Sequence, residues 1–287
     1  MSENNQERNR TARERIQRER RLEKSRERRR RVLIVSAAVA AVLGLAAVIG
    51  VLAANTDKKK DSVSTAGPLL APTGAEGKER LAIPVGASDA PSTLTVWEDF
   101  RCPVCAQFEN VLRDAIRELE ASGALKVEYH FATIIDGNMG GTGSLRAANA
   151  VACSQDAGKF VPYHDVLYRN QPPEPDDAFA DNGRLIELAG KVDGLDTPGF
   201  RSCVEGGTHD SWVAKSNTAF QKGGFRGTPT VLLNGESVFP GKGGEQISPE
   251  NLKKWVAEAN KGKKPGTQRP GPASPGAGSP ASGPAVP

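Results

Sequence analysis

The stretch Glu98-Asp-Phe-Arg-Cys-Pro-Val-Cys105 decides how this sequence is interpreted. An alternating run typical of a strand, Thr93–Glu98, leads into it, and an apolar pattern at helical spacing, 106–120, follows it. A Cys-x-x-Cys pair that opens a helix places its first sulfur beside unpaired backbone N–H groups and the positive end of the helix dipole, which stabilise a thiolate. The second sulfur lies within bonding reach, and the proline between them suits the first helical turn. The spacing therefore predicts redox chemistry at Cys102 and Cys105.

A zinc site is the alternative interpretation of this pair. It would need two further ligands, and the available side chains are Cys153, Cys203, His130, His164 and His209. None of them forms a second close pair of the kind that structural zinc sites use. The sequence therefore favours redox chemistry, and we expect no metal site.

The N-terminal region indicates membrane topology. Residues 32–54 carry no charge over a length sufficient to span a hydrocarbon core of roughly 30 Å, which predicts a transmembrane helix. The 31 residues before it hold 13 Arg or Lys and 6 Asp or Glu, so the positive-inside rule places them in the cytoplasm and the rest of the chain outside. Lys58-Lys-Lys60 opposes this orientation with fewer charges. A signal peptide cleaved after Val51-Leu-Ala53 is the alternative, but the long apolar and basic segments favour a retained anchor.

The basic tail, residues 1–31, could suggest nucleic-acid binding. Acids alternate with its arginines, as in Arg13-Glu-Arg15 and Arg26-Glu-Arg28, and it has no aromatic residue. A solvated tail that touches anionic lipid head groups explains this composition better. We therefore expect no nucleic-acid partner.

Composition divides the remainder into three segments. Residues 55–80 are polar and rich in small residues, which predicts a flexible linker. Residues 261–287 are dominated by Pro, Gly, Ala and Ser and predict a disordered tail. Between them, residues 81–260 are long enough for one domain that buries a full core without depending on disulfides.

Within this domain the pattern predicts an α/β fold. A strand at 93–98, the helix after the cysteines and a strand at 125–131 make a β-α-β unit, which implies a right-handed parallel crossover. A helical insertion follows at about 138–222. The run 230–233, the turn Asn234-Gly235 and the run 237–239 predict a β-hairpin, and Ser248-Pro249 begins a last helix.

These features together resemble the thioredoxin-fold oxidoreductases of the DsbA type over roughly residues 81–260. The resemblance rests on the Cys-Pro-Val-Cys motif at the strand-to-helix junction and on Gly227-Thr-Pro-Thr230 before the hairpin. It implies a cis-proline at Pro229 beside the cysteines. It also implies that Cys153 and Cys203, inside the insertion, form the extra structural disulfide of actinobacterial relatives.

The resemblance implies that the two sulfurs have different roles. A substrate thiolate attacks Cys102, the exposed sulfur, and Cys105 is the buried leaving and resolving sulfur. The resemblance also implies that the backbone of Thr228 pairs with an extended substrate segment. Two departures from the family concern redox strength. Val104 stands where strong oxidants carry His, which predicts a moderate oxidant, and Val96 stands where a buried acid is common, so that Glu98 is the candidate for proton transfer.

We therefore expect a membrane-anchored, extracytoplasmic thiol–disulfide oxidoreductase that introduces disulfides into secreted or membrane proteins, without a cofactor. The resemblance implies reoxidation by a membrane partner of the VKOR or DsbB kind. Two alternatives stay open. One is a thiol reductase or isomerase, since the motif does not fix the direction of electron flow. The other is a metal-binding or assembly module on the same fold.

Overall fold

The computed structural model describes residues 69–268. The basic tail (1–31), the predicted transmembrane helix (32–54), most of the predicted linker and residues 269–287 lie outside this range. Within residues 69–268, no helix combines the length and the apolar character needed to cross a bilayer.

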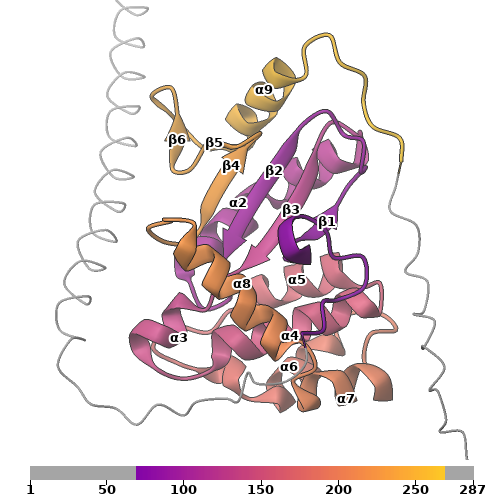
Figure 1. Ribbon diagram of the computed structural model, residues 1–287, viewed down its shortest axis with the longest axis vertical. Coiled ribbons are helices and arrows are strands. Elements are labelled where there is room, and N and C mark those ends of the chain that lie inside the picture. Colours follow the sequence, from indigo (N-terminus) through magenta and orange to yellow (C-terminus); the bar gives the residue numbers. More distant parts are fainter. Residues whose placement is uncertain (1–68, 269–287) are drawn as a thin grey trace, which may run out of the picture. The chain divides into compact units, whose positions relative to one another are not determined.

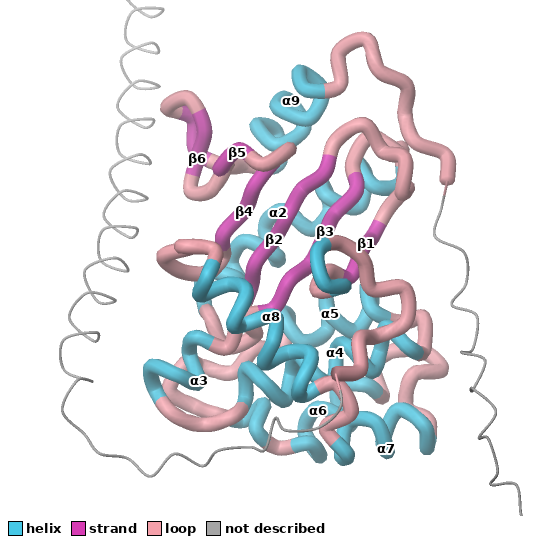
Figure 2. Tube along the Cα trace, in the orientation of Figure 1, coloured by secondary structure: helices cyan, strands magenta, loops and turns pink. Residues whose placement is uncertain are grey.

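A five-stranded sheet forms the centre of the domain (Figures 1 and 2). Its strands, in the spatial order β1-β3-β2-β4-β5, are β1 (Ile83–Val85), β2 (Thr93–Glu98), β3 (Lys126–Phe131), β4 (Thr230–Leu233) and β5 (Glu236–Ser237). The predicted parallel pairing of β2 and β3 is confirmed, with Val96 opposite Tyr129, and the other pairs are antiparallel. The short strand β1 was not predicted, because three residues that include a proline give no alternating pattern. A separate ribbon pairs β6 (Gly241–Lys242) with β7 (Glu245–Gln246).

Helices supply the rest of the core. They are α2 (Pro103–Ala121), α3 (Ile134–Met139), α4 (Gly143–Asp156), α5 (Phe160–Arg169), α6 (Asn182–Ala189), α7 (Pro198–Gly206), α8 (Asp210–Lys222) and α9 (Pro249–Ala259), with short 3-10 turns at Lys78–Arg80 and Ala178–Ala180. The helical insertion between β3 and β4 is thus confirmed, and it begins at Ile134, slightly earlier than expected. α2 begins at Pro103, three residues before the predicted range, because the proline occupies the first helical position.

The two faces of the sheet carry different clusters. Leu94 and Val96 of β2 are fully buried in the main core together with residues of α2. On the opposite face, Trp97 stacks on His130 with ring centroids 4.2 Å apart, and Phe220 of α8 covers this pair. The alternation of β2 therefore directs residues 94, 96 and 98 towards α2.

The predicted hairpin and the predicted start of the last helix are confirmed, and α7 also begins with a capping side chain. Asn234 (φ 51°) and Gly235 (φ 86°) both adopt left-handed backbone conformations, as a two-residue hairpin turn requires. Thr197 accepts a hydrogen bond from the N–H of Phe200 at the start of α7, and Ser248 accepts one from Asn251 at the start of α9.

The ordered domain is longer at both ends than composition indicated. In the predicted linker, the backbone N–H and the hydroxyl of Thr73 both donate to Oδ1 of Asp156. In the predicted disordered tail, the N–H of Gly266 donates to the carbonyl of Gly123. The hydrogen bonds of Thr73 and Gly266 to distant segments thus extend the described domain beyond the predicted boundaries at residues 80 and 261, whatever the composition of these segments.

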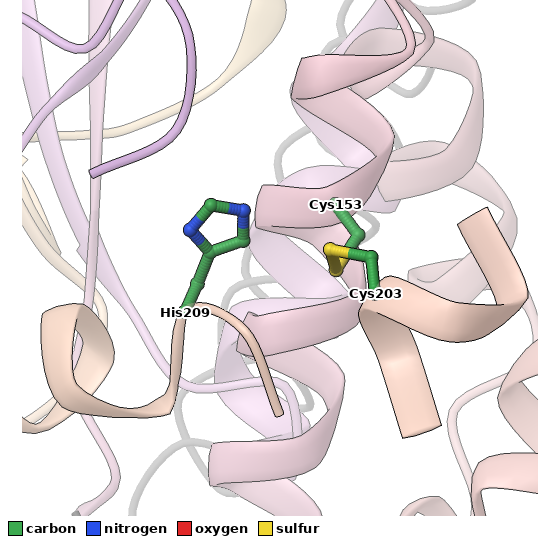
Figure 3. Close-up of side chains that lie close together, drawn as sticks. All are labelled: Cys153, Cys203 and His209. Atoms are coloured by element: carbon green, nitrogen blue, oxygen red, sulfur yellow. A yellow bond between two sulfur atoms is a disulfide. The ribbon is translucent and has the colours of Figure 1, made fainter. Parts of the chain in front are cut away.

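The predicted disulfide is confirmed (Figure 3). Cys153 of α4 is bonded to Cys203 of α7, with their Cα atoms 5.9 Å apart. His209 lies beside this bridge, and its two ring nitrogens are 2.7 Å from the carbonyl oxygen of Leu70 and 2.8 Å from Oδ2 of Asp156. This corner thus joins two helices of the insertion and holds the segment that enters the domain.

Candidate active site

The two cysteines of the motif lie at the N-terminus of α2, directly after β2. Cys102 is the N-cap residue, with extended backbone angles, and Cys105 lies in the first turn. The N–H of Cys105 donates to the carbonyl of Cys102, which closes the turn that brings the two side chains together. Both are free cysteines in this structure. The local sequence thus positions two thiols beside the unpaired N–H groups that begin the helix.

Burial distinguishes the two sulfurs less sharply than expected. Cys102 is 6% exposed and Cys105 is fully buried. The predicted order is therefore confirmed, but the description of Cys102 as exposed was wrong. The reason is tertiary, because the loop before β4 lies against Cys102.

That loop contains the predicted proline. The Thr228–Pro229 peptide bond is cis, as the resemblance implied. The thiol of Cys102 donates a hydrogen bond to the carbonyl oxygen of Thr228 at 3.3 Å, although the two residues are 126 positions apart in the sequence. The fold thus brings Cys102, Thr228 and Pro229 together.

Hydrogen bonds to its sulfur make Cys102 the more acidic thiol. A hydrogen bond from the Cys105 thiol has the largest effect and lowers the pKa of Cys102, while burial opposes it. The side chain of Thr228 and the backbone N–H of Cys105 lower this pKa further. The hydroxyl oxygen of Thr228 is buried and has no hydrogen-bond partner among the described residues, so it is free to donate to the Cys102 thiolate. Donors that favour the charged form therefore surround the sulfur.

Cys105 has the opposite character. Burial, and then the neighbouring Cys102 sulfur, raise the pKa of Cys105 well above its ordinary value, and the charge of Glu98 acts in the same direction. Negative charge is therefore held by Cys102 and disfavoured on Cys105. This asymmetry suits a nucleophile or electrophile at Cys102 and a resolving thiol at Cys105.

A second loop supports the turn that carries the motif. The side-chain amide of Gln171 donates to the carbonyls of Phe100 and Cys102, at 2.8 and 3.0 Å. Arg101 is 2% exposed, and its Nη1 lies 2.8 Å from Oδ1 of Asp136 and 3.0 Å from Oδ1 of Asp177. These contacts attach the helical insertion to the cysteine turn.

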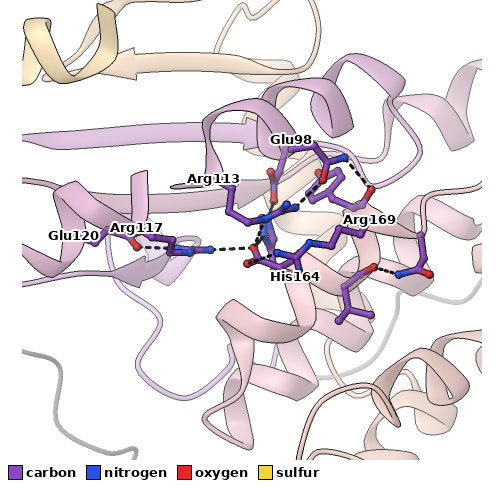
Figure 4. A network of polar contacts seen from close by, with 11 residues as sticks. Glu98, Arg113, Arg117, Glu120, His164 and Arg169 are labelled. Carbon is purple, nitrogen blue, oxygen red and sulfur yellow. Dashed lines mark hydrogen bonds and ion pairs between the residues drawn. The ribbon is translucent and has the colours of Figure 1, made fainter. Parts of the chain in front are cut away.

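Glu98, the candidate for proton transfer, is fully buried at the end of β2. Its Oε1 lies 2.7 Å from Nε2 of His164 on α5, which is also fully buried (Figure 4). Glu109, one turn after Cys105 on α2, is buried nearby, and burial raises the pKa of its carboxyl to about 8. Glu98, Glu109 and His164 therefore form one buried cluster of ionisable side chains.

Sequence reasoning missed His164 and Glu109. Nothing in the neighbourhood of His164 in the sequence distinguishes it from an ordinary core histidine. A signal for Glu109 did exist, since residues 105 and 109 are separated by four positions and must share one face of the helix.

Comparisons with known proteins agree with this geometry. A family model described as thioredoxin matches residues 79–258. The probable disulfide bond formation protein D of Bacillus cereus is 24% identical over 160 residues, covering 54% of this chain and 71% of that protein. Disulfide bond formation protein D of Bacillus subtilis is 25% identical over 156 residues, covering 54% and 68%. Oxidised DsbA of Mycobacterium tuberculosis has 27% sequence identity and a TM-score of 0.53, covering 64% of this chain and 94% of its own.

The chain belongs to the thioredoxin family. It is a DsbA-like thiol–disulfide oxidoreductase. This class is supported by the Cys-Pro-Val-Cys motif, by the cis-proline loop and by the similarity to disulfide bond formation proteins.

Proposed function

We propose that this protein is an extracytoplasmic oxidase that introduces disulfides into secreted or membrane proteins through the Cys102–Cys105 pair. The observation that carries the proposal is the asymmetry of the site. Cys102 lies at a helix N-terminus, contacts Thr228 and has a lowered pKa. Cys105 is fully buried and has a raised pKa.

The reaction follows from this asymmetry. A substrate thiolate attacks Sγ of Cys102 in the disulfide form, the bond between Cys102 and Cys105 breaks, and its electron pair goes to Sγ of Cys105. A second substrate thiolate then attacks the substrate sulfur of the mixed disulfide, and Cys102 leaves as a thiolate. The substrate is oxidised by two electrons, and the pair on the enzyme becomes a dithiol.

Substrate recognition involves the loop before β4. The carbonyl of Thr228 points at Cys102, and the adjacent cis-Pro229 has no N–H to offer. An extended substrate segment that hydrogen-bonds to the backbone of Thr228 would bring its own cysteine to Cys102. Main-chain recognition of this kind accepts many sequences, which suits an enzyme that oxidises diverse proteins.

The location and the redox partner are proposed from the sequence. The uncharged stretch 32–54 after a basic tail supports a single membrane anchor with the catalytic domain outside the cytoplasm. A membrane enzyme of the VKOR or DsbB kind would reoxidise the dithiol. Anchoring would confine both partners to one surface and raise their effective concentration.

The test is turnover of a reduced, unfolded protein substrate. The full chain in its disulfide form should oxidise stoichiometric amounts of substrate thiols, and it should become catalytic when an oxidant regenerates it. The Cys102→Ser/Cys105→Ser double variant is the matched control, because it keeps the Cys153–Cys203 bridge. If the protein instead reduces disulfides and shows a strongly reducing equilibrium with glutathione, it is a reductase. If it binds a stoichiometric metal through the two thiols and turns over no dithiol, it is a binding module.

A further inference from the structure

An exposed positive charge lies in the loop that carries the cis-proline. Arg226 is three residues before Pro229 in the sequence, and its side chain is exposed. It forms no hydrogen bond or ion pair with any residue of the described range. The disulfide exchange at Cys102 does not use it. Its guanidinium is therefore free to bind a molecule that approaches the site.

The other arginine near the cysteines is not available in this way. Arg101 directly precedes Cys102, but it is only 2% exposed. Its Nη1 lies 2.8 Å from Oδ1 of Asp136 and 3.0 Å from Oδ1 of Asp177, so two carboxylates of the insertion balance its charge. Arg101 therefore holds the insertion against the cysteine turn, whereas Arg226 keeps an unbalanced charge at the surface.

The backbone on both sides of Arg226 is fixed. Before it, the ring of Phe225 packs against Trp97 of β2, with ring centroids 5.5 Å apart. After it, the hydroxyl of Thr230 donates to the carbonyl of Gly227 at 2.7 Å. A charged side chain on a fixed backbone gives up less conformational freedom when it binds a partner than one on a loose loop. The loop thus presents the guanidinium at a defined place.

This place is close to the reactive sulfur. The carbonyl oxygen of Thr228 accepts a hydrogen bond from the thiol of Cys102 at 3.3 Å. Arg226 precedes Thr228 by two residues, and two residues of chain span at most about 7 Å. That span is shorter than the Debye length of about 8 Å at physiological ionic strength. A substrate whose cysteine reaches Cys102 therefore brings its neighbouring side chains within range of the charge.

We propose that Arg226 is a specificity residue that favours substrates with an acidic side chain close to the reacting cysteine. This inference rests on the proposed function, because it names the substrate class of the same site. The guanidinium pairs with an Asp or Glu carboxylate of the substrate while the substrate thiolate attacks Sγ of Cys102. The ion pair takes no part in the transfer of electrons, which pass from the substrate sulfurs to the disulfide of the enzyme. It acts on how readily the substrate cysteine is brought to Cys102.

The proposal adds selection by charge to recognition of the main chain. Hydrogen bonds to the backbone of Thr228 accept any sequence, whereas a guanidinium beside them attracts acidic segments and repels basic ones. Glu174 and Asp176 lie on the insertion loop that contacts Arg101, and neither forms an ion pair with Arg226 in the described domain. The substrate is therefore the partner that the charge lacks. Because the contact is exposed to solvent, we expect a preference of a few-fold.

The test uses three dithiol peptides that differ only in the residues flanking their two cysteines, which are aspartates, asparagines or lysines. The full chain in its disulfide form is mixed with each peptide at low salt, and the second-order rate constant of a single turnover is measured. The peptide loses two electrons and two protons to form its internal disulfide, and Cys102 and Cys105 become thiols. Each rate is divided by that of the same peptide with bis(2-hydroxyethyl) disulfide, because flanking charges also change the acidity of the peptide thiols.

For the wild type, we expect the corrected rate of the aspartate peptide to exceed that of the lysine peptide at least about threefold. Arg226→Gln should bring this ratio close to one, Arg226→Lys should retain it and Arg226→Glu should invert it. Lys222→Gln is the matched control, because it removes an exposed positive charge four residues earlier, at the end of α8, and it should keep the wild-type ratio. Raising the salt to about 0.5 M should weaken the preference. Each ratio compares two peptides on one protein preparation, so partial misfolding of a variant does not alter it.

A wild-type ratio of one, or a ratio that Arg226→Gln leaves unchanged, would overturn the proposal. An equal loss of preference in Lys222→Gln would assign the effect to net charge and would overturn it as well. Failure of the proposed function gives a different result. Wild-type protein that oxidises none of the three peptides contradicts the function and the inference together, whereas oxidation of all three at equal corrected rates contradicts only the inference.

Discussion

The thiol of Cys102 donates to the carbonyl oxygen of Thr228 at 3.3 Å. This contact joins the start of α2 to the loop that begins β4, and it places the reactive sulfur under the backbone that we assign to substrate recognition. The same loop therefore influences both the acidity of the sulfur and the approach of a substrate.

The roles of the two cysteines predict opposite trapping behaviour. Cys105→Ser leaves Cys102 able to form a mixed disulfide but removes the thiol that resolves it. We expect this variant to accumulate substrate adducts on non-reducing gels, and Cys102→Ser to accumulate none and to have lost oxidase activity. Adducts formed by Cys102→Ser instead would reverse the assignment.

The hydroxyl of Thr228 predicts a measurable change in acidity. Thr228→Val keeps the shape of the side chain and removes the donor that helps to lower the pKa of Cys102. The pKa of Cys102, followed by thiolate absorbance or by the rate of alkylation, should rise. Thr218→Val, at an exposed position on α8, should leave it unchanged. An unaltered pKa in Thr228→Val would show that the hydroxyl does not contact the thiolate.

The buried carboxyl of Glu109 predicts a pH dependence of stability. Its folded pKa of about 8 lies above the ordinary value of 4.5, so the folded protein binds more protons than the unfolded chain between these pH values. Its contribution to the free energy of unfolding therefore decreases as pH rises from about 4.5 to 8, by at most about 1.4 kcal/mol per pH unit for this proton. His164, with a folded pKa raised to about 10, extends the decrease above pH 6.5.

Glu109→Gln should flatten this dependence between pH 5 and 8. Denaturant unfolding of the dithiol form across that range is the measurement. Glu118→Gln, on the exposed side of the same helix, is the control and should keep the wild-type slope. A slope that Glu109→Gln does not alter would place the titrating group elsewhere.

The bridge between Cys153 and Cys203 predicts a loss of stability without a loss of chemistry. It closes a loop of 50 residues, which corresponds to roughly 4 kcal/mol in the chain-entropy model. The Cys153→Ala/Cys203→Ala variant should unfold roughly 5–15 °C lower. Its folded form should still react at Cys102 with dithiothreitol at the wild-type rate. A folded variant as inactive as Cys102→Ser would show instead that the second pair takes part in the reaction.

The local sequence pattern was sufficient to predict the strands, helices and turns whose geometry depends on neighbouring residues. The strand before Cys102, the helix that Pro103 begins and the turn at Asn234-Gly235 each follow from short-range geometry: alternation, helical spacing and the backbone angles that a tight turn needs. The cis bond at Pro229 and the pairing of Cys153 with Cys203 came from resemblance, because no local rule fixes either.

Tertiary structure decided the burial and the charge of the site. Glu98 and His164 are 66 residues apart, and only the packing of α5 beside β2 makes them partners. The same packing removes Glu109 and Cys105 from water, which raises the pKa of both. Sequence thus determined which thiols react, since spacing and a helix start suffice for that. The acidity of the two thiols was decided by the fold, since a pKa depends on desolvation and on charges that distant segments bring together.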